Sequence, residues 1–171
     1  MRQVLTILVL LSFMESRSQN ATPCSSPEAS QFDFWSGEWD LYWKDSLRGS
    51  NKIEKLFGNC VVQENFMDPK LGYLGKSWTV YNANYQYWQQ TWVDNGGAYI
   101  HLTGKMVGDS IILYTEERKV PAKLSPTGLM KNRMVYYHIE KDSFDWSWEA
   151  STDGGQTWKP NWQIHYTRKK S

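Results

Sequence analysis

Short segments in which aromatic residues alternate with polar ones recur along this chain. Residues 38–44 read Glu-Trp-Asp-Leu-Tyr-Trp-Lys, and residues 143–150 read Ser-Phe-Asp-Trp-Ser-Trp-Glu-Ala. Successive side chains of a β-strand point to opposite faces, so a period of two places the Trp and Phe rings of each segment on one face. The chain is therefore predicted to be an all-β protein whose strands carry aromatic faces.

Ten short segments rich in Trp, Tyr, Val, Ile and Thr, several of them with an aromatic face, follow one another with mostly short connections, which predicts an antiparallel up-and-down meander. Closing this meander into a barrel removes its exposed edges. The longest connection is residues 118–128, with two prolines. The predicted strands are residues 38–44, 51–57, 61–67, 75–82, 87–93, 98–103, 110–116, 131–140, 143–150 and 158–168. The predicted turns are residues 47–49, 68–69, 95–97, 108–109, 141–142 and 153–155, where Gly, Asp, Asn and Pro gather.

The N-terminus has the features of a secretory signal peptide. Arg2 precedes the apolar run 4–14, which is shorter than the roughly 20 apolar residues that span a bilayer. Small residues at 16 and 18 predict cleavage before Gln19. The mature protein is therefore expected to be secreted or periplasmic and not attached to a membrane. The expected organisation is a signal peptide at 1–18, an N-terminal arm at 19–31 and a barrel domain at 32–171.

The start of the mature chain holds a helix signal and a cysteine. Ser26 fits an N-cap and Pro27 a first helical position, which predicts a short helix near 26–34. Cys24 and Cys60 are the two cysteines of the chain. An exported protein meets an oxidising compartment, so an intrachain disulfide between them is the simplest prediction.

Charge and motif content exclude several classes of function. The 19 Lys and Arg nearly balance the 18 Asp and Glu, so no basic surface for nucleic acid is expected. The chain has no G-x-S-x-G sequence and no phosphate-binding loop. His101, His138 and His165 are not at metal-ligand spacing, and two cysteines without clustered histidines make a poor zinc site. Neither a metal nor a cofactor is expected, and the expected partner is a small molecule.

Residues 151–158 read Ser-Thr-Asp-Gly-Gly-Gln-Thr-Trp, which fits the S-x-D-x-G-x-T-W pattern of the Asp-box of sialidases. Asp153 can bind the backbone N–H groups of a turn, the glycines allow positive φ, and Trp158 anchors the outgoing strand. A sialidase propeller needs about four or more blades of roughly 40 residues, each with its own turn. One copy in 171 residues therefore predicts a structural β-hairpin and not a sialidase.

Gly37-Glu38-Trp39 at the start of the first predicted strand resembles the G-x-W of lipocalin-like barrels of the calycin superfamily. The resemblance extends over residues 24–168. Over this range the sequence is similar to a group of secreted bacterial lipocalin-like proteins of uncharacterised function. It departs at Asn59, where glycine is usual, at Phe66, where Trp is common, and over residues 118–131. The segments that carry the resemblance are residues 32–40, 58–66, 75–82, 88–97, 148–158 and 165–168.

The resemblance implies a calycin barrel and gives two residues a structural role. In that superfamily the Trp of G-x-W closes the base of the barrel, and an Arg near the end of the last strand packs across it. Trp39 and Arg168 are at the matching positions. A guanidinium over an indole contributes about 0.5–2 kcal/mol as a cation–π contact.

The aromatic faces predict a cavity lined by indoles if they point into the barrel. The ligand is then a small, partly apolar molecule that stacks on Trp rings and is oriented by a few polar groups. The expected stacking residues are Trp78, Trp88, Trp92 and Trp148, and the expected orienting residues are Glu64 and Gln90.

Several alternatives stay open at the level of sequence, although binding is favoured over catalysis. Glu64 among indoles has a raised pKa and suits an isomerase, cyclase or lyase that uses one acid/base group. A filled aromatic core suits a structural or partner-binding protein. Haem needs an axial ligand such as His165, but this side chain lies on the opposite face from Arg168 if strand parity holds. Arg133 and Glu149 can pair inside the barrel or stay solvated outside it.

Overall fold

Residues 24–170 are described by the computed structural model. The predicted signal peptide at 1–18 and the beginning of the arm at 19–31 lie outside the described residues. The helical elements within the described part are two 3₁₀ turns, η1 (Pro27–Ser30) and η2 (Asp33–Trp35). None of the helical elements there has the length and apolarity needed to cross a membrane.

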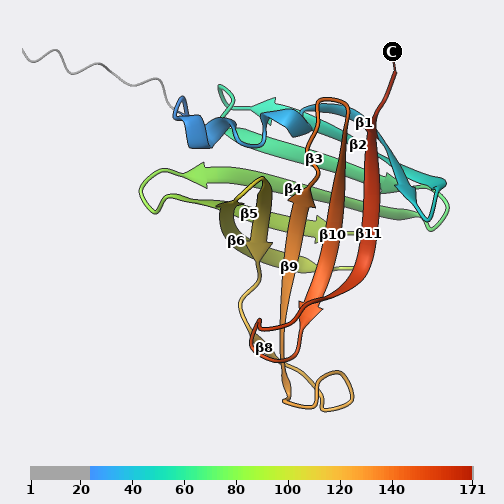
Figure 1. Ribbon diagram of the computed structural model, residues 1–171. Helices are drawn as coiled ribbons and strands as arrows, with labels where there is room; N and C mark the ends of the chain where they lie inside the picture. The colour runs from blue at the N-terminus through green and yellow to red at the C-terminus, as the bar shows by residue number, and fades with distance from the viewer. Residues whose placement is uncertain (1–23, 171) are drawn as a thin grey trace, which may run out of the picture.

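Ten antiparallel strands form a closed barrel, as the alternating pattern predicts (Figure 1). β1 pairs with β11 and β9 pairs with both β7 and β10, so the sheet has no open side. β2 to β5 run across the view of Figure 1, and β9 to β11 run down it. The strands are β1 (Gly37–Trp43), β2 (Ser46–Leu56), β3 (Val61–Asp68), β4 (Tyr73–Asn82), β5 (Tyr87–Asp94), β6 (Tyr99–Val107), β7 (Ser110–Tyr114), β9 (Leu129–Tyr137), β10 (Ser143–Ser151) and β11 (Lys159–Arg168), with a two-residue strand β8 (Arg118–Lys119) paired to β9.

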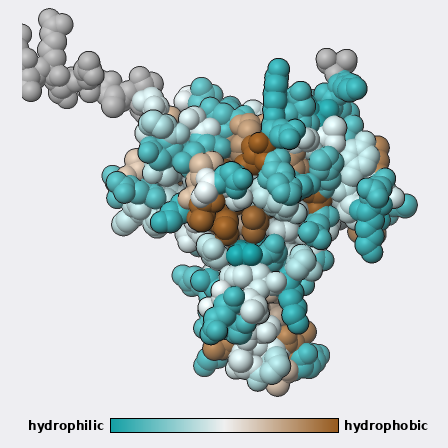
Figure 2. Space-filling model, viewed as in Figure 1, coloured by the Kyte–Doolittle hydropathy of each residue, from teal (hydrophilic) through white to brown (hydrophobic). Residues whose placement is uncertain are grey.

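A projection extends below the barrel in Figure 1 and consists of β8, the long connection after it and the β10–β11 turn. Hydrophilic residues cover much of the visible surface of both the barrel and this projection (Figure 2). Asp153 accepts hydrogen bonds from the backbone N–H groups of Gln156 and Thr157, each at 3.0 Å. These bonds lower the pKa of Asp153 below its ordinary value, with the bonds from Thr157 as the main cause. The Asp-box is therefore a turn within one hairpin.

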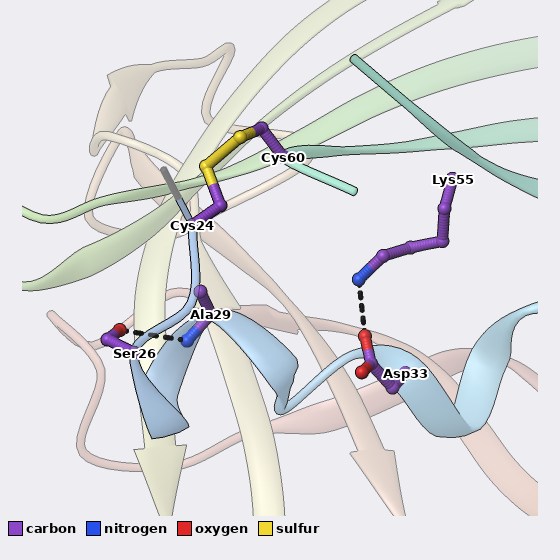
Figure 3. Close-up of a disulfide and its surroundings, with 6 residues drawn as sticks. All are labelled: Cys24, Ser26, Ala29, Asp33, Lys55 and Cys60. Atoms are coloured by element: carbon purple, nitrogen blue, oxygen red, sulfur yellow. Dashed lines mark hydrogen bonds and ion pairs between the residues drawn. A yellow bond between two sulfur atoms is a disulfide. The ribbon is translucent and has the colours of Figure 1, made fainter. Parts of the chain in front are cut away.

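The segment of η1 and η2 closes one end of the barrel. The Ser26 hydroxyl accepts a hydrogen bond from the Ala29 N–H at 3.3 Å, as expected of an N-cap (Figure 3). The predicted helix near 26–34 is therefore present as two 3₁₀ turns. Phe32 and Trp35 are fully buried in the barrel core. We call residues 27–35 the end plug.

A disulfide and an ion pair attach the end plug to neighbouring strands. Cys24 and Cys60 form the predicted disulfide, which connects the start of the plug to the residue before β3 (Figure 3). Lys55 of β2 forms an ion pair with Asp33 of η2. The plug is therefore fixed to the barrel wall at two separate points.

Arg168 of β11 joins the closing strands to the end plug. Its guanidinium lies 4.2 Å from the ring centre of Trp39 and donates hydrogen bonds to the carbonyl oxygens of Ser36 and Phe34 at 2.8 and 2.9 Å. Gly37 has a φ of 119°, and a Cβ atom there would lie 2.7 Å from Arg168 Nη1. Glycine is therefore required before Trp39 both by the backbone conformation and by the position of this guanidinium.

One predicted turn is wrong. Residues 47–49 lie inside β2, and the chain reverses at Lys44 and Asp45 instead. These two residues have φ values of 51° and 60°. Two-residue hairpins of type I′ need positive φ at both positions and usually place Gly or Asn there. The turn was predicted at residues 47–49 because Gly49 is there, whereas the actual turn contains neither Gly nor Asn.

Replacing Arg168 with alanine should lower the free energy of unfolding by about 2–4 kcal/mol. The change removes one cation–π contact and leaves partly buried carbonyl groups without a donor. Chemical denaturation of the oxidised mature protein measures the effect. Arg118→Ala is the matched control, because Arg118 is exposed on β8. Equal losses for the two variants would contradict the assigned role of Arg168.

Removing the disulfide by a Cys24→Ser, Cys60→Ser double substitution should lower the free energy of unfolding by about 3–4 kcal/mol. The bridge closes a loop between residues 36 positions apart, and the chain-entropy model gives this magnitude for such a loop. Denaturation curves of the two proteins measure the difference. A thiol titration of the unreduced protein that finds two free thiols would contradict the bridge itself.

Candidate functional site

A cavity of about 140 Å³ lies inside the barrel. The inward side chains of β5 lie in different parts of the barrel interior. Trp88 is fully buried and its ring centre lies 4.7 Å from that of Phe32 in the end plug, whereas Trp92 lines the cavity. Gln90 lies between these two indoles in sequence and on the same face. The barrel interior therefore has a filled half next to the plug, a polar middle and a half with a cavity.

Aromatic rings form most of the cavity wall. Trp162 of β11 is central to this wall, because its ring centre lies 5.5 Å from that of Trp146 and 5.8 Å from that of Phe66. Both contacts are edge-to-face, the arrangement favoured by aromatic quadrupoles. Two buried tyrosines, Tyr136 and Tyr166, also line the cavity. The other aromatic residues of the wall are Phe66, Tyr73, Trp92, Trp146, Trp148 and Trp162.

Asp94 at the end of β5 fixes two of these rings. It accepts hydrogen bonds from the Tyr73 hydroxyl at 2.7 Å and from Trp92 Nε1 at 2.9 Å. Burial opposes the ionisation of Asp94, but these bonds and two from backbone N–H groups outweigh it and lower its pKa. The backbone of Gly75, the cross-strand partner of Asp94, also lies close to this ring, since a Cβ atom at Gly75 would come within 2.0 Å of Trp92 Cζ2. The indole is thus held by a hydrogen bond to a carboxylate and by close contact with a backbone that has no side chain.

Glu64 of β3 is the one carboxylate of the cavity wall among the described residues. It is buried and accepts hydrogen bonds from Asn51 Nδ2 and the Ser77 hydroxyl, both at 2.6 Å. Burial raises the pKa of Glu64 to about 7, although these two bonds favour its ionised form. Near neutral pH the carboxyl group therefore exists in both protonation states.

Two tyrosine hydroxyls extend the polar middle of the barrel. The hydroxyl oxygen of Tyr136 on β9 accepts a hydrogen bond from Gln90 Nε2 at 3.4 Å. The hydroxyl oxygen of Tyr166 on β11 accepts one from Asn51 Nδ2, also at 3.4 Å. Burial raises the pKa of both tyrosines well above the ordinary value, and the charge of Glu64 raises it further. Both hydroxyls therefore stay protonated at neutral pH. The polar floor of the cavity is the name we give to Glu64 together with Asn51, Ser77, Gln90, Tyr136 and Tyr166.

Three of the six predicted binding residues line the cavity, namely Glu64, Trp92 and Trp148. Gln90 is buried in the polar floor, where it donates to Thr79 Oγ1 at 2.9 Å, but it does not line the cavity. Trp88 belongs to the filled half. The prediction that these two residues contact the ligand therefore finds no support in their positions.

The prediction for Trp78 is wrong, because its side chain is 39% exposed on the outside of the barrel. On β4 the inward positions are Gly75, Ser77 and Thr79, all of them buried. Large side chains from the neighbouring strands, such as Trp92, occupy the space next to these small ones. Trp78 is therefore the aromatic residue of β4 that points outward, whereas Tyr73 and Tyr81 share the inward face and pack against the core.

Sequence reasoning missed several residues of the site. On β10, Trp146 shares a face with Trp148, and on β11, Trp162 shares a face with Arg168. The alternation of side chains was therefore sufficient to find both. Asp94 shares the face of Trp92 in the same way. Tyr73 carried no such signal, because it lies at the first position of its strand.

The remaining polar candidates lie on the outside of the barrel. Arg133 and Glu149 form an ion pair at 2.6 Å, and the guanidinium lies 4.4 Å from the ring centre of Trp158. His138 and His165 both contact the carboxylate of Asp145, at 2.8 and 2.7 Å. No histidine lines the cavity, so no such side chain within residues 24–170 reaches it as an axial ligand. Those residues also contain no group of three or more metal-ligating side chains.

The comparisons with known proteins give no family assignment. No protein-family model matches the chain, and no curated protein has a significant match to it. The geometry of the cavity is therefore the basis for a functional conclusion.

Glu64 should make the stability of the protein fall as pH rises between about 4.5 and 7. In that window the unfolded chain releases the proton of Glu64 while the folded chain retains it, so the folded state binds more protons. Replacing Glu64 with glutamine removes this term. The stability of the variant relative to the unaltered protein should therefore increase by about 3 kcal/mol between pH 4.5 and 8.

Urea denaturation of both proteins across this pH range measures the difference. Glu117→Gln, on the exposed connection after β7, controls for the loss of a carboxylate from the chain. A difference between the Glu64→Gln variant and the unaltered protein that stays constant with pH would show that burial does not shift the pKa of Glu64.

Proposed function

We propose that this chain is an exported barrel that binds a small, partly apolar molecule in its aromatic cavity. The observation that carries this proposal is the composition of the cavity wall, in which six aromatic rings surround one buried carboxyl group. Ligand sites in proteins are mostly apolar and contain a few placed polar groups that orient the ligand.

The volume of the cavity limits the size of the ligand. A cavity of about 150 Å³ in another protein holds one benzene molecule, and the cavity here is about 140 Å³. The part of the ligand inside the barrel is therefore about one ring in size. A macrocycle such as haem does not fit in this space.

The disulfide supports export, because disulfides persist in oxidising compartments and are rare in reducing ones. The calycin assignment is also part of the proposal. Its support is the closed antiparallel barrel together with the contact between Trp39 and Arg168 at the closing strands.

A second candidate function is catalysis by Glu64 as a general acid or base. The observation that favours it is the raised pKa of about 7, since a group that titrates near neutral pH can both accept and donate a proton. Turnover that is lost in the Glu64→Gln variant while ligand binding is retained would identify an enzyme. The edge-to-face packing around the cavity is equally compatible with a rigid binding site.

Toluene should bind to the mature protein and quench its Trp fluorescence. The Trp148→Ala substitution should weaken this binding at least tenfold, because it removes one side of the cavity wall and admits water. The matched change Trp78→Ala should leave the affinity unchanged, since Trp78 lies on the outer face. Calorimetry gives the dissociation constants, and circular dichroism checks that both variants fold.

Native mass spectrometry of the protein purified from its own compartment complements this test. An added mass that disappears on denaturation identifies the class of the natural ligand. If toluene and similar one-ring compounds fail to bind, or if Trp78→Ala weakens binding as much as Trp148→Ala, the internal binding site is refuted.

A further inference from the structure

The polar floor of the cavity contains more hydrogen-bond acceptors than donors. The Glu64 carboxylate can accept about four hydrogen bonds and receives two, from Asn51 and Ser77. Asn51 Oδ1 and Gln90 Oε1 are buried and have no donor among residues 24–170. Neither amide oxygen lines the cavity, so the acceptor that a ligand can reach there is Glu64, whose carboxylate has room for further donors.

When Glu64 is ionised, the cavity wall carries a negative charge without a matching positive one. Glu64 lines the cavity, and none of the other lining residues is Lys, Arg or His. A buried charge without a partner is costly. Arg168, by contrast, has a partner of opposite charge. Its guanidinium lies against an indole and is paired with the carboxylate of Asp142 at 3.1 Å. No such cation within residues 24–170 lines the cavity beside Glu64.

The aromatic rings around the cavity are suited to a positive charge. Indole and phenol faces attract cations through their quadrupole, and such contacts strengthen when water is excluded. Trp92, Trp146 and Trp162 all line the cavity together with Glu64. An aromatic cage with a carboxylate at its floor is the arrangement by which proteins recognise organic ammonium groups.

We propose that the ligand is a small organic ammonium ion, whose charged nitrogen donates to Glu64 and whose hydrocarbon part packs on the indoles. This inference rests on the proposed binding function and narrows it to one chemical class. An amine with one ring, such as benzylamine, has the size that the cavity allows.

The groups that face Glu64 do not change their protonation state near neutral pH. The titration of Glu64 itself is therefore the one that affects binding. Asn51 of β2, Ser77 of β4 and Gln90 of β5 do not titrate, and Tyr136 of β9 and Tyr166 of β11 have pKa values raised far above neutral. Asp94, at the rim, has a lowered pKa and stays ionised. An ammonium ion therefore binds the ionised form of Glu64, which the free protein loses as pH falls below about 7.

The test compares benzylammonium with benzyl alcohol, which has nearly the same shape and no charge. At pH 8 benzylammonium should bind at least tenfold more tightly by calorimetry. Its affinity should fall about tenfold per pH unit below pH 7, while that of benzyl alcohol should not fall. In the Glu64→Gln variant the preference for the cation should disappear, and in the Glu117→Gln control it should remain.

The outcomes separate this inference from the function on which it rests. Benzyl alcohol binding as tightly as benzylammonium, or more tightly, would overturn the cation preference and leave the binding site intact. Failure of both compounds and of toluene would overturn both. The pH profile of the unaltered protein decides the question without any variant, because an affinity for benzylammonium that stays constant from pH 5.5 to 8 excludes Glu64 as its partner.

Discussion

The pairing of β1 with β11 is the constraint on which the rest of this structure depends. It converts a ten-strand meander into a barrel, and the register places Trp39 opposite Arg168. The Arg168 guanidinium then reaches past Gly37 to the carbonyl groups of the end plug. One side chain thus connects the first strand, the last strand and the segment that fills one end of the barrel. An interior with a defined filled half and a defined cavity requires this closure.

The polar floor separates the two halves of the interior. Rings of the end plug pack on Trp88, Tyr136 and Phe144 on one side of it, at edge-to-face geometry. On the other side the aromatic rings are spaced around a cavity instead of filling it. Glu64 belongs to this boundary, so it is buried and at the same time lines the cavity. A carboxyl group at such a position costs stability when it is ionised.

Much of the fold was predictable because side-chain alternation has a direct physical meaning in a strand. All ten barrel strands and the disulfide were found in this way or from cysteine count. The site was harder, because alternation assigns two faces without saying which one is inside. Trp78 shows the difficulty, since it points outward although it is the largest side chain of β4, while Gly75, Ser77 and Thr79 point inward. These small residues leave room for Trp92 of the adjacent strand, and the β4 sequence by itself does not contain that information.

Gly75 has a consequence for the size of the cavity. The Trp92 ring rests on the bare backbone of this residue, at a distance where even a methyl group would collide with it. Any larger residue must displace the indole, and the indole is one wall of the cavity. One substitution behind the wall can therefore change the size of the cavity without altering any residue that lines it.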